Sequence, residues 1–341
     1  MQQKQKKELK DDFILKQIKS YNNKLIKQAF ENTDLGLKHG KLGICIYFYI
    51  QNKIFNDKIY EDKAENLLRN ILSNINYIKD YNLTRGITGI GFGILYLLKN
   101  GLCEGNPNIV LKDIDDTIFK ALCDSIMNNK KDIHEDIFKC IYLCVRIKNS
   151  QISKIEKEMF EEILKRSFNK IYNFIPYIIN SEPQIFSPFD YSLLMFMYLT
   201  IRMKELNLYE KKINRMLQEW LPQINSIRPI SKGHQYLLYK MIEEIQDIHQ
   251  NTENNTLNKD FFFHEMKNMS LSFATGVSGL WLFMNIANLK DPKISELIID
   301  KIRLSEIWIR FNDIESILTS DSLFTGLPGI ILTYQKLAHN V

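Results

Sequence analysis

Apolar runs alternate with amphipathic segments along this chain. The amphipathic segments lie at residues 60–78, 155–179, 209–227 and 294–311. In the last of them Ile294, Ile298 and Ile302 recur at helical spacing, while Lys, Glu, Asp and Arg fill the opposite positions. This period predicts half-exposed helices. The apolar runs lack a polar face and therefore predict helices that are buried on every side.

Each clear apolar run opens with the same signature, Gly-x-x-Gly. The signature occurs at residues 40–43, 86–89, 276–279 and 326–329, and it uses eight of the 14 glycines. The first two and the last two copies are separated by roughly 45 to 50 residues, the length of a two-helix repeat. Three degenerate units, starting at residues 136, 190 and 233, fill the central interval at similar spacing. We therefore predict seven repeats, each with one apolar and one amphipathic helix.

These repeats predict an all-α protein with apolar inner helices and amphipathic outer helices. Glycines at positions i and i+3 share a helix face and allow close backbone approach, so we expect the glycine pairs to face neighbouring inner helices. Repeats run through the whole chain without a Pro-, Ser- or Gly-rich linker, which favours a single domain over residues 1–341. Residues 1–12 and 250–260 are polar and are expected to be flexible.

Composition limits the possible partners and location. The charge of +5 comes from 45 basic and 40 acidic residues spread along the chain, so a nucleic-acid partner is not implied. The longest apolar runs are about a dozen residues, shorter than the roughly 20 that a transmembrane helix needs. The basic N-terminus leads into charged residues and not into the apolar segment of a signal peptide. The five cysteines form no Cys-x-x-Cys pair and fit buried free thiols, so we expect a cytoplasmic protein.

Three of the inner-helix openings can be compared residue by residue. They read His39-Gly40-x-x-Gly43-Ile44, Thr275-Gly276-x-x-Gly279-Leu280 and Leu323-Phe324-Thr325-Gly326-x-Pro328-Gly329-Ile330. With the sevenfold spacing, they resemble the lanthionine synthetase C-like family. The resemblance implies an α/α toroid of seven inner and seven outer helices. It also implies a role in lanthipeptide (bacteriocin) biosynthesis, where the family's cyclases add cysteine thiols to dehydrated Ser or Thr residues of a precursor peptide. The expected partners are that peptide and other peptide-modifying enzymes.

The zinc site of the resembling cyclases is not matched. Those enzymes hold zinc with a Cys two residues before the first Gly of the fifth unit and a Cys-His pair just before the first Gly of the sixth. The matching positions here hold Ser231, Ala274 and Thr275, and Phe189 stands where the cyclases carry a fourth-unit histidine. Neither a methyl group nor a hydroxyl replaces a thiolate or an imidazole as a zinc ligand. We therefore predict no cofactor, and the sequence leaves open whether the chain is catalytic.

Candidate binding residues lie at the starts of the inner helices, which converge at one end of the predicted ring, here called the mouth. Arg85, Lys232 and His234 could clamp a carboxylate or phosphate, helped by helix N-termini that favour anions. A solvated rim of charge explains the same residues equally well. Thr275 and Thr325 are further binding candidates, although helix N-caps are the favoured interpretation of both.

His39 and Asp132 are the candidates for acid–base catalysis. A histidine exchanges protons near neutral pH, and Asp132 matches the place of an acidic residue in the resembling cyclases. The favoured alternative for Asp132 is a helix-start acid that interacts well with the helix macrodipole. His134 lies close enough in the sequence to orient Asp132.

Three classes of function fit these observations. The first is a zinc-independent enzyme acting on a ribosomally made peptide, and the second is a non-catalytic peptide-binding or docking subunit. The third is an α/α-toroid enzyme acting on glycans or isoprenoids, since fold alone does not assign function. Glycan hydrolysis needs two carboxylates about 5 to 10 Å apart. The acidic residues near the mouth, Asp132, Glu135 and Asp136, all lie at one helix start, so this third class ranks last.

Overall fold

The computed structural model describes residues 2–128, 132–149, 152–247, 266–289, 291–309 and 322–339. Every secondary-structure element within these ranges is a helix, apart from an isolated bridge between Ser270 and Gly276. The predicted all-α class is therefore confirmed. The segment 250–260 and residues 310–311, for which we made predictions, lie outside the described ranges.

Internal contacts divide the chain into two compact units. Unit 1 consists of Met1–Ile78, Met269–Leu282 and Lys290–Val341, and unit 2 consists of Lys79–Asn268 and Phe283–Leu289. Each unit contains its own pairs of inner and outer helices.

An inner helix begins within a few residues of each predicted repeat start. These helices are α2 (Lys41–Phe55), α4 (Ile87–Lys99), α7 (Ile133–Asn149), α10 (Ser192–Glu205), α12 (Lys232–Asp247), α14 (Val277–Ile286) and α16 (Leu327–His339). Their burial follows from their composition. In α2 every residue from Leu42 to Gln51 is buried, and in α10 every residue from Leu193 to Ile201 is buried.

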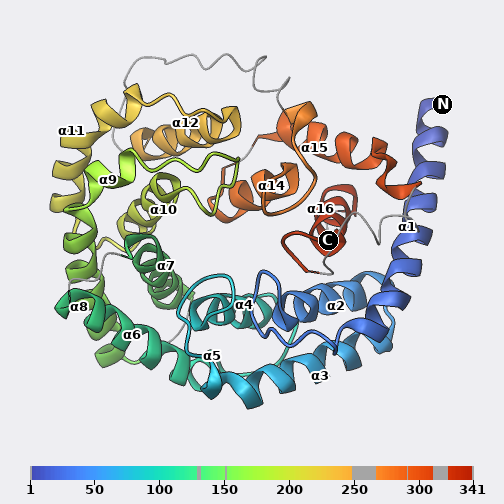
Figure 1. Ribbon diagram of the computed structural model, residues 1–341, viewed down its shortest axis with the longest axis horizontal. Coiled ribbons are helices and arrows are strands. Elements are labelled where there is room, and N and C mark those ends of the chain that lie inside the picture. Colours follow the sequence, from blue (N-terminus) through green and yellow to red (C-terminus); the bar gives the residue numbers. More distant parts are fainter. Residues whose placement is uncertain are drawn as a thin grey trace. The chain divides into compact units, whose positions relative to one another are not determined.

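The outer helices bury one face only. They are α3 (Lys58–Asn74), α6 (Lys112–Met127), α8 (Lys154–Tyr172), α11 (Glu210–Ser226) and α15 (Pro292–Leu304). In α3 the buried residues are Tyr60, Ala64, Leu67 and Ile71, at the spacing of a single helical stripe. Outer helices pack on inner ones within each unit: α3 on α2 and α15 on α16 in unit 1, α8 on α7 in unit 2 (Figure 1). Short helices α5 (Pro107–Val110) and α9 (Ile175–Ile179) and the 3₁₀ turns η1 (Ile75–Tyr77) and η2 (Glu306–Trp308) connect them.

The N-terminal segment is helical, and Asp11 ties it to the rest of unit 1. Residues 2–12, which we expected to be flexible, belong to helix α1 (Gln2–Gln28). The Asp11 carboxylate accepts hydrogen bonds from Arg303 Nε (2.8 Å) and from the Tyr334 hydroxyl (2.6 Å). Asp11 therefore anchors α1 to α15 and α16, a long-range contact that the local composition did not reveal.

The glycine pairs lie at the starts of the inner helices, and six of the eight glycines closely approach the backbone of the preceding loop. Gly86 is the N-cap of α4, and a Cβ atom added there would lie 2.6 Å from the carbonyl oxygen of Asp80. The same carbonyl accepts the backbone N–H of Ile87 at 2.9 Å. Gly40 and Gly276 repeat this arrangement with the carbonyls of Asp34 and Ser270. The first glycine thus lets each loop fold back onto the start of its own helix.

The second glycine of three pairs has a related role, and a Cβ atom at Gly43 or Gly329 would also meet the Leu323 or Phe273 side chain of the loop before another inner helix. A Cβ atom at Gly43 would lie 2.5 Å from the carbonyl oxygen of Leu37, and Gly279 and Gly329 meet the carbonyls of Phe273 and Leu323 in the same way. By contrast, Gly91 inside α4 meets the Tyr142 ring of the inner helix α7, which is the contact expected of the pairs.

Candidate functional site

In the loop before an inner helix, a side-chain oxygen accepts hydrogen bonds from backbone N–H groups three or four residues later in the chain. Asn82 Oδ1 accepts the backbone N–H groups of Arg85 (2.8 Å) and Gly86 (3.1 Å). Serines do the same in the last two repeats: Ser272 Oγ accepts the N–H of Thr275, and Ser322 Oγ accepts the N–H of Thr325. These are the side-chain turns that Asn and Ser favour. They fix the backbone of the residue that directly precedes the first glycine.

In unit 1 the loops before α2, α14 and α16 are joined by backbone hydrogen bonds. The Phe324 N–H donates to the Lys38 carbonyl at 3.2 Å, and the Ala274 N–H donates to the Phe324 carbonyl at 2.9 Å. The structure therefore brings His39, Thr275 and Thr325 onto three connected loops.

A chain of three polar groups runs from His39. Its half-buried imidazole places Nδ1 3.3 Å from Ser322 Oγ, which in turn lies 2.6 Å from Thr325 Oγ1. Ser322 was not among the sequence candidates. The repeated string Ser-x-x-Thr-Gly, at residues 272–276 and 322–326, is the signal that could have found it.

The cationic candidates Arg85 and Lys232 lie in unit 2. Arg85 is exposed and directly precedes the N-cap of α4. Lys232 is the first residue of α12 and is half-buried, and its ammonium donates to Gln235 Oε1 at 3.2 Å. Both residues occupy the predicted place at an inner-helix start.

His234, in contrast, is buried and paired. Its Nε2 atom lies 3.0 Å from the Ser187 nitrogen and 3.2 Å from the Ser187 oxygen, and Nδ1 lies 3.1 Å from Glu182 Oε1. The ring packs between Phe186 and Tyr191, with centroids 5.0 and 4.8 Å away. His234 therefore fastens the loop before α10 to α12, which departs from the prediction that it clamps a ligand.

The structure supports the helix-start interpretation of Asp132. Asp132 is exposed, and its Oδ1 atom lies 3.4 Å from the Glu135 N–H at the start of α7. His134 Nδ1 pairs with Ser192 Oγ of α10 at 3.0 Å, and the ring packs edge-on against Phe138, while the orienting of Asp132 by His134 stays a prediction. The catalytic role of Asp132 stays a prediction.

Asp136, on the first turn of α7, holds a buried ionic cluster that the sequence did not reveal. Its carboxylate accepts from Lys139 at 3.0 Å and from Lys170 of α8 at 2.9 Å, and it also accepts from the Ser125 hydroxyl of α6. These pairs tie three helices of unit 2 together. The carboxylate is thus held by three side chains of unit 2.

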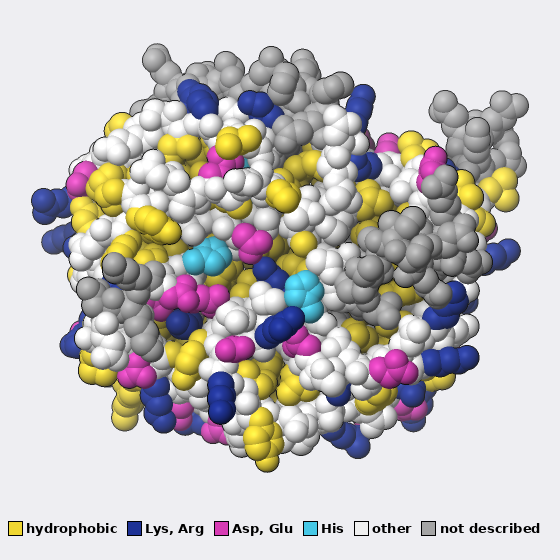
Figure 2. All heavy atoms as spheres, in the orientation of Figure 1, with side chains coloured by type: hydrophobic (Ala, Val, Ile, Leu, Met, Phe, Trp, Pro, Cys, Tyr) yellow, Lys and Arg dark blue, Asp and Glu magenta, His cyan; other side chains and the backbone are white. Residues whose placement is uncertain are grey.

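The surface carries charge of both signs. Figure 2 shows basic and acidic side chains intermingled over the face in view, in agreement with their even spread along the sequence. Among the described helices, none combines the length and the apolar character that crossing a membrane requires.

A family model described as lanthionine synthetase C-like protein matches residues 2–188, more than half of the chain. The chain belongs to the lanthionine synthetase C-like family. The α/α toroid is the fold class of this family, and the inner and outer helices found here are its building units. Among solved structures, nisin cyclase is similar with 16% sequence identity, 95% coverage of both chains and a TM-score of 0.49. No curated protein sequence matches the chain.

The family implies zinc, but the residues at the matching positions do not fit it. Ser231, Ala274 and Thr275 offer hydroxyls and a methyl group where thiolate and imidazole are needed. The Thr275 hydroxyl instead completes a triangle with Ser270 and Ser272, with oxygen–oxygen distances of 3.2 to 3.3 Å. Across the described residues, no three His, Cys, Asp or Glu side chains gather in a group that could hold a metal ion.

Proposed function

We propose that this lanthionine synthetase C-like protein is a cytoplasmic component of lanthipeptide-type maturation that binds a precursor peptide at the starts of its inner helices. It works beside other peptide-modifying enzymes and without the family's zinc site. The proposal rests on one observation: the chain belongs to the family, yet Ser231, Ala274 and Thr275 occupy the positions of the family's zinc ligands. A peptide-binding surface needs no zinc, whereas activation of a thiol at the family's site does.

The charge at the inner-helix starts supports peptide binding in unit 2. Arg85 and Lys232 each place a cation at the N-terminal end of an inner helix, where the partial positive charge of the helix adds to their own. Carboxylates of an acidic peptide are attracted to such a surface, and the attraction weakens as salt rises.

Charge reversal tests this binding. Arg85→Glu combined with Lys232→Glu should weaken binding of a fluorescently labelled acidic peptide by at least about tenfold, which corresponds to about 1.4 kcal/mol. Fluorescence anisotropy at low and high salt gives the affinities. The matched control is Lys120→Glu with Lys211→Glu, which changes the net charge equally at exposed positions on α6 and α11. Equal affinity of the two double variants would place the peptide elsewhere.

Metal analysis tests the second half of the proposal. The full-length protein, purified without chelator and dialysed, should contain far less than one zinc per chain by plasma mass spectrometry. Adding a chelator should leave its thermal midpoint and its peptide affinity unchanged, because no donor set of thiolate and imidazole exists at the family positions. One zinc per chain that survives dialysis would contradict this expectation.

A further inference from the structure

The buried ionic cluster around Asp136 carries more positive than negative charge. Asp136 and Lys139 of α7 and Lys170 of α8 have side chains that are 2%, 8% and 9% exposed. Among the residues that the structure describes, Asp136 is the only carboxylate within ion-pair distance of either ammonium. Two cations and one anion give a net charge of +1 (2 − 1) in a place that water hardly reaches. Burying such a charge is unfavourable unless a counter-charge compensates it.

The two ammonium groups differ in how many of their hydrogens are used. A lysine ammonium has three donors. Lys170 Nζ donates to the Ser125 carbonyl (3.0 Å), to the Ser125 hydroxyl (2.6 Å) and to Asp136 Oδ2 (2.9 Å), so all of its donors have partners. Lys139 Nζ donates to Asp136 Oδ1 at 3.0 Å and, within the described part of the chain, to no second oxygen. The excess charge therefore lies at Lys139.

A further neighbour of the Lys139 ammonium is an aromatic ring at the surface. Lys139 Nζ lies 5.8 Å from the centre of the Tyr81 ring, and Tyr81 is 42% exposed. The Thr88 hydroxyl of α4 donates to the Tyr81 carbonyl, which holds the backbone of this loop and does not restrict rotation of the ring. Exposed side chains change rotamer within nanoseconds. A ring face also attracts an ammonium more weakly than an anion does.

We propose that Lys139 and the Tyr81 ring form a binding subsite for a small oxyanion, a carboxylate or a phosphate group. Rotation of the ring admits the anion to the ammonium, and the anion then offsets the excess charge of the cluster. The low dielectric of a buried site strengthens this attraction.

The sequence position of Tyr81 suggests where such an anion comes from. Tyr81 lies four residues before Arg85, in the loop that leads to α4, so an acidic side chain of a peptide bound at Arg85 would lie near the subsite. This source of the anion rests on the proposed function, whereas the affinity for a free anion does not.

Thermal unfolding of the full-length protein in inorganic phosphate tests the subsite without any peptide. Ionic strength is held constant with sodium chloride, so that general screening does not change. A ligand of the folded state raises the thermal midpoint as its concentration rises, so the midpoint of the parent protein should rise with phosphate. Calorimetric titration gives the affinity.

Lys139→Met removes the excess charge and leaves Asp136 paired with Lys170, so the variant should fold. It should weaken phosphate binding by at least about tenfold. The matched control is Lys120→Met, which removes an exposed cation of α6 and should bind phosphate like the parent. Tyr81→Ala keeps both buried lysines and uncovers the ammonium, so it should bind phosphate at least as tightly as the parent.

The subsite is overturned if phosphate does not stabilise the parent, if Lys139→Met binds phosphate as tightly as the parent, or if Tyr81→Ala loses the binding. Competition with the fluorescently labelled acidic peptide identifies the source of the anion. A peptide carboxylate in the subsite should make phosphate a better competitor in the parent than in Lys139→Met. Phosphate binding without competition would assign the subsite to a free anion. A peptide that does not bind at all would refute the proposed function and leave the phosphate results standing.

Discussion

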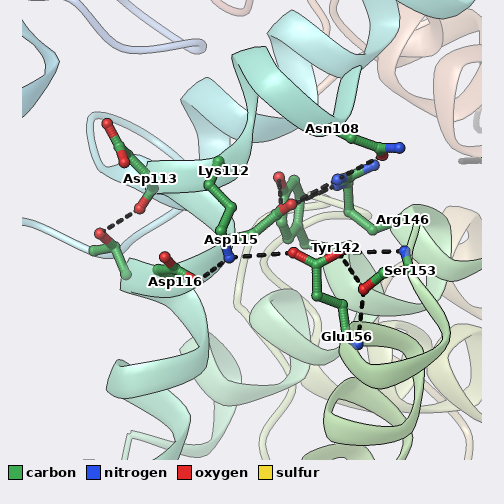
Figure 3. Close-up of polar contacts among 10 residues, drawn as sticks. Asn108, Lys112, Asp113, Asp115, Asp116, Tyr142, Arg146, Ser153 and Glu156 are labelled. Atoms are coloured by element: carbon green, nitrogen blue, oxygen red, sulfur yellow. Dashed lines mark hydrogen bonds and ion pairs between the residues drawn. The ribbon is translucent and has the colours of Figure 1, made fainter. Parts of the chain in front are cut away.

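A buried ion pair in unit 2 allows a quantitative test of how α6 and α7 are held together. Arg146 Nε lies 2.9 Å and Nη2 2.6 Å from Asp115 Oδ2, and the Tyr142 hydroxyl donates to Asp115 Oδ1 at 2.7 Å (Figure 3). The side chains of Arg146 and Asp115 are 1% and 5% exposed. Burial raises the pKa of the Asp115 carboxyl, while the hydrogen bonds and charge of Arg146 act to lower it.

Removing one partner should cost much more than removing both charges. Arg146→Met leaves a buried carboxylate with Tyr142 as its remaining side-chain donor, and the loss of an ion-pair partner in such a place costs about 3–5 kcal/mol. Unfolding free energies are about 5–15 kcal/mol in total, so this variant should lose a large share of its stability. Adding Asp115→Asn removes the second charge and keeps an oxygen for the Tyr142 hydroxyl. The double variant should then lose only about 1–2 kcal/mol, the worth of a neutral hydrogen bond.

Urea unfolding followed by circular dichroism measures these differences, with the slope used to check that the same surface unfolds. The control is Lys112→Met, which breaks the half-exposed pairs of Lys112 with Asp116 and Glu156 in the same region and should cost less than about 1 kcal/mol (Figure 3). The reasoning fails if the double variant loses as much unfolding free energy as Arg146→Met and Asp115→Asn lose together. The two buried charges would then not interact.

Two further predictions concern the ends of helices. Gly86→Ala should destabilise the protein by about 1–3 kcal/mol in urea unfolding, because the new methyl group would lie 2.6 Å from the Asp80 carbonyl oxygen. Ser153→Ala removes the capping box of α8 and should cost about 1 kcal/mol at neutral pH. The hydrogen bond from Ser153 and then the pairing with Lys112 lower the pKa of Glu156, so the box stabilises above the ordinary carboxyl pKa and is lost as the pH falls through the lowered value. The difference between parent and Ser153→Ala should therefore shrink in acid, and a constant difference would count against the assignment.

The alternation of helix types could be predicted because it depends on burial alone. An apolar run such as Leu42–Gln51 has no face that tolerates water, whatever surrounds it, and the amphipathic stripe of α3 has only one face to bury. The role of the glycine pairs could not be predicted in the same way. The spacing shows that Gly40 and Gly43 lie on one face, but not that the loop beginning at Asp34 returns to cover it.

The sequence predicted that the candidate residues lie at the starts of inner helices, but it did not predict their contacts. His39 and Thr325 were expected near one another because both precede the first glycine of a repeat, and the structure places both within hydrogen-bonding reach of Ser322. Lys232 and His234 look alike as neighbours in the sequence, yet two residues on a helix point about 200° apart. Lys232 is therefore partly exposed, whereas His234 is turned inward to Glu182. The sequence predicted that the repeat starts at residue 233, whereas α12 begins at Lys232. The sequence alone therefore did not show which of the two side chains faces outward.

The residues at the family's zinc positions and the proposed peptide-binding residues are different. A change at the zinc positions therefore does not imply a change in peptide binding. The hydroxyls of Thr275, Ser270 and Ser272 lie 3.2 to 3.3 Å from one another at the turn before α14. Arg85 and Lys232 start other inner helices and keep the cations that an acidic peptide would meet. The altered zinc positions in unit 1 therefore leave the proposed peptide contacts of unit 2 unchanged, so metal content and peptide affinity can be measured as independent properties of the chain.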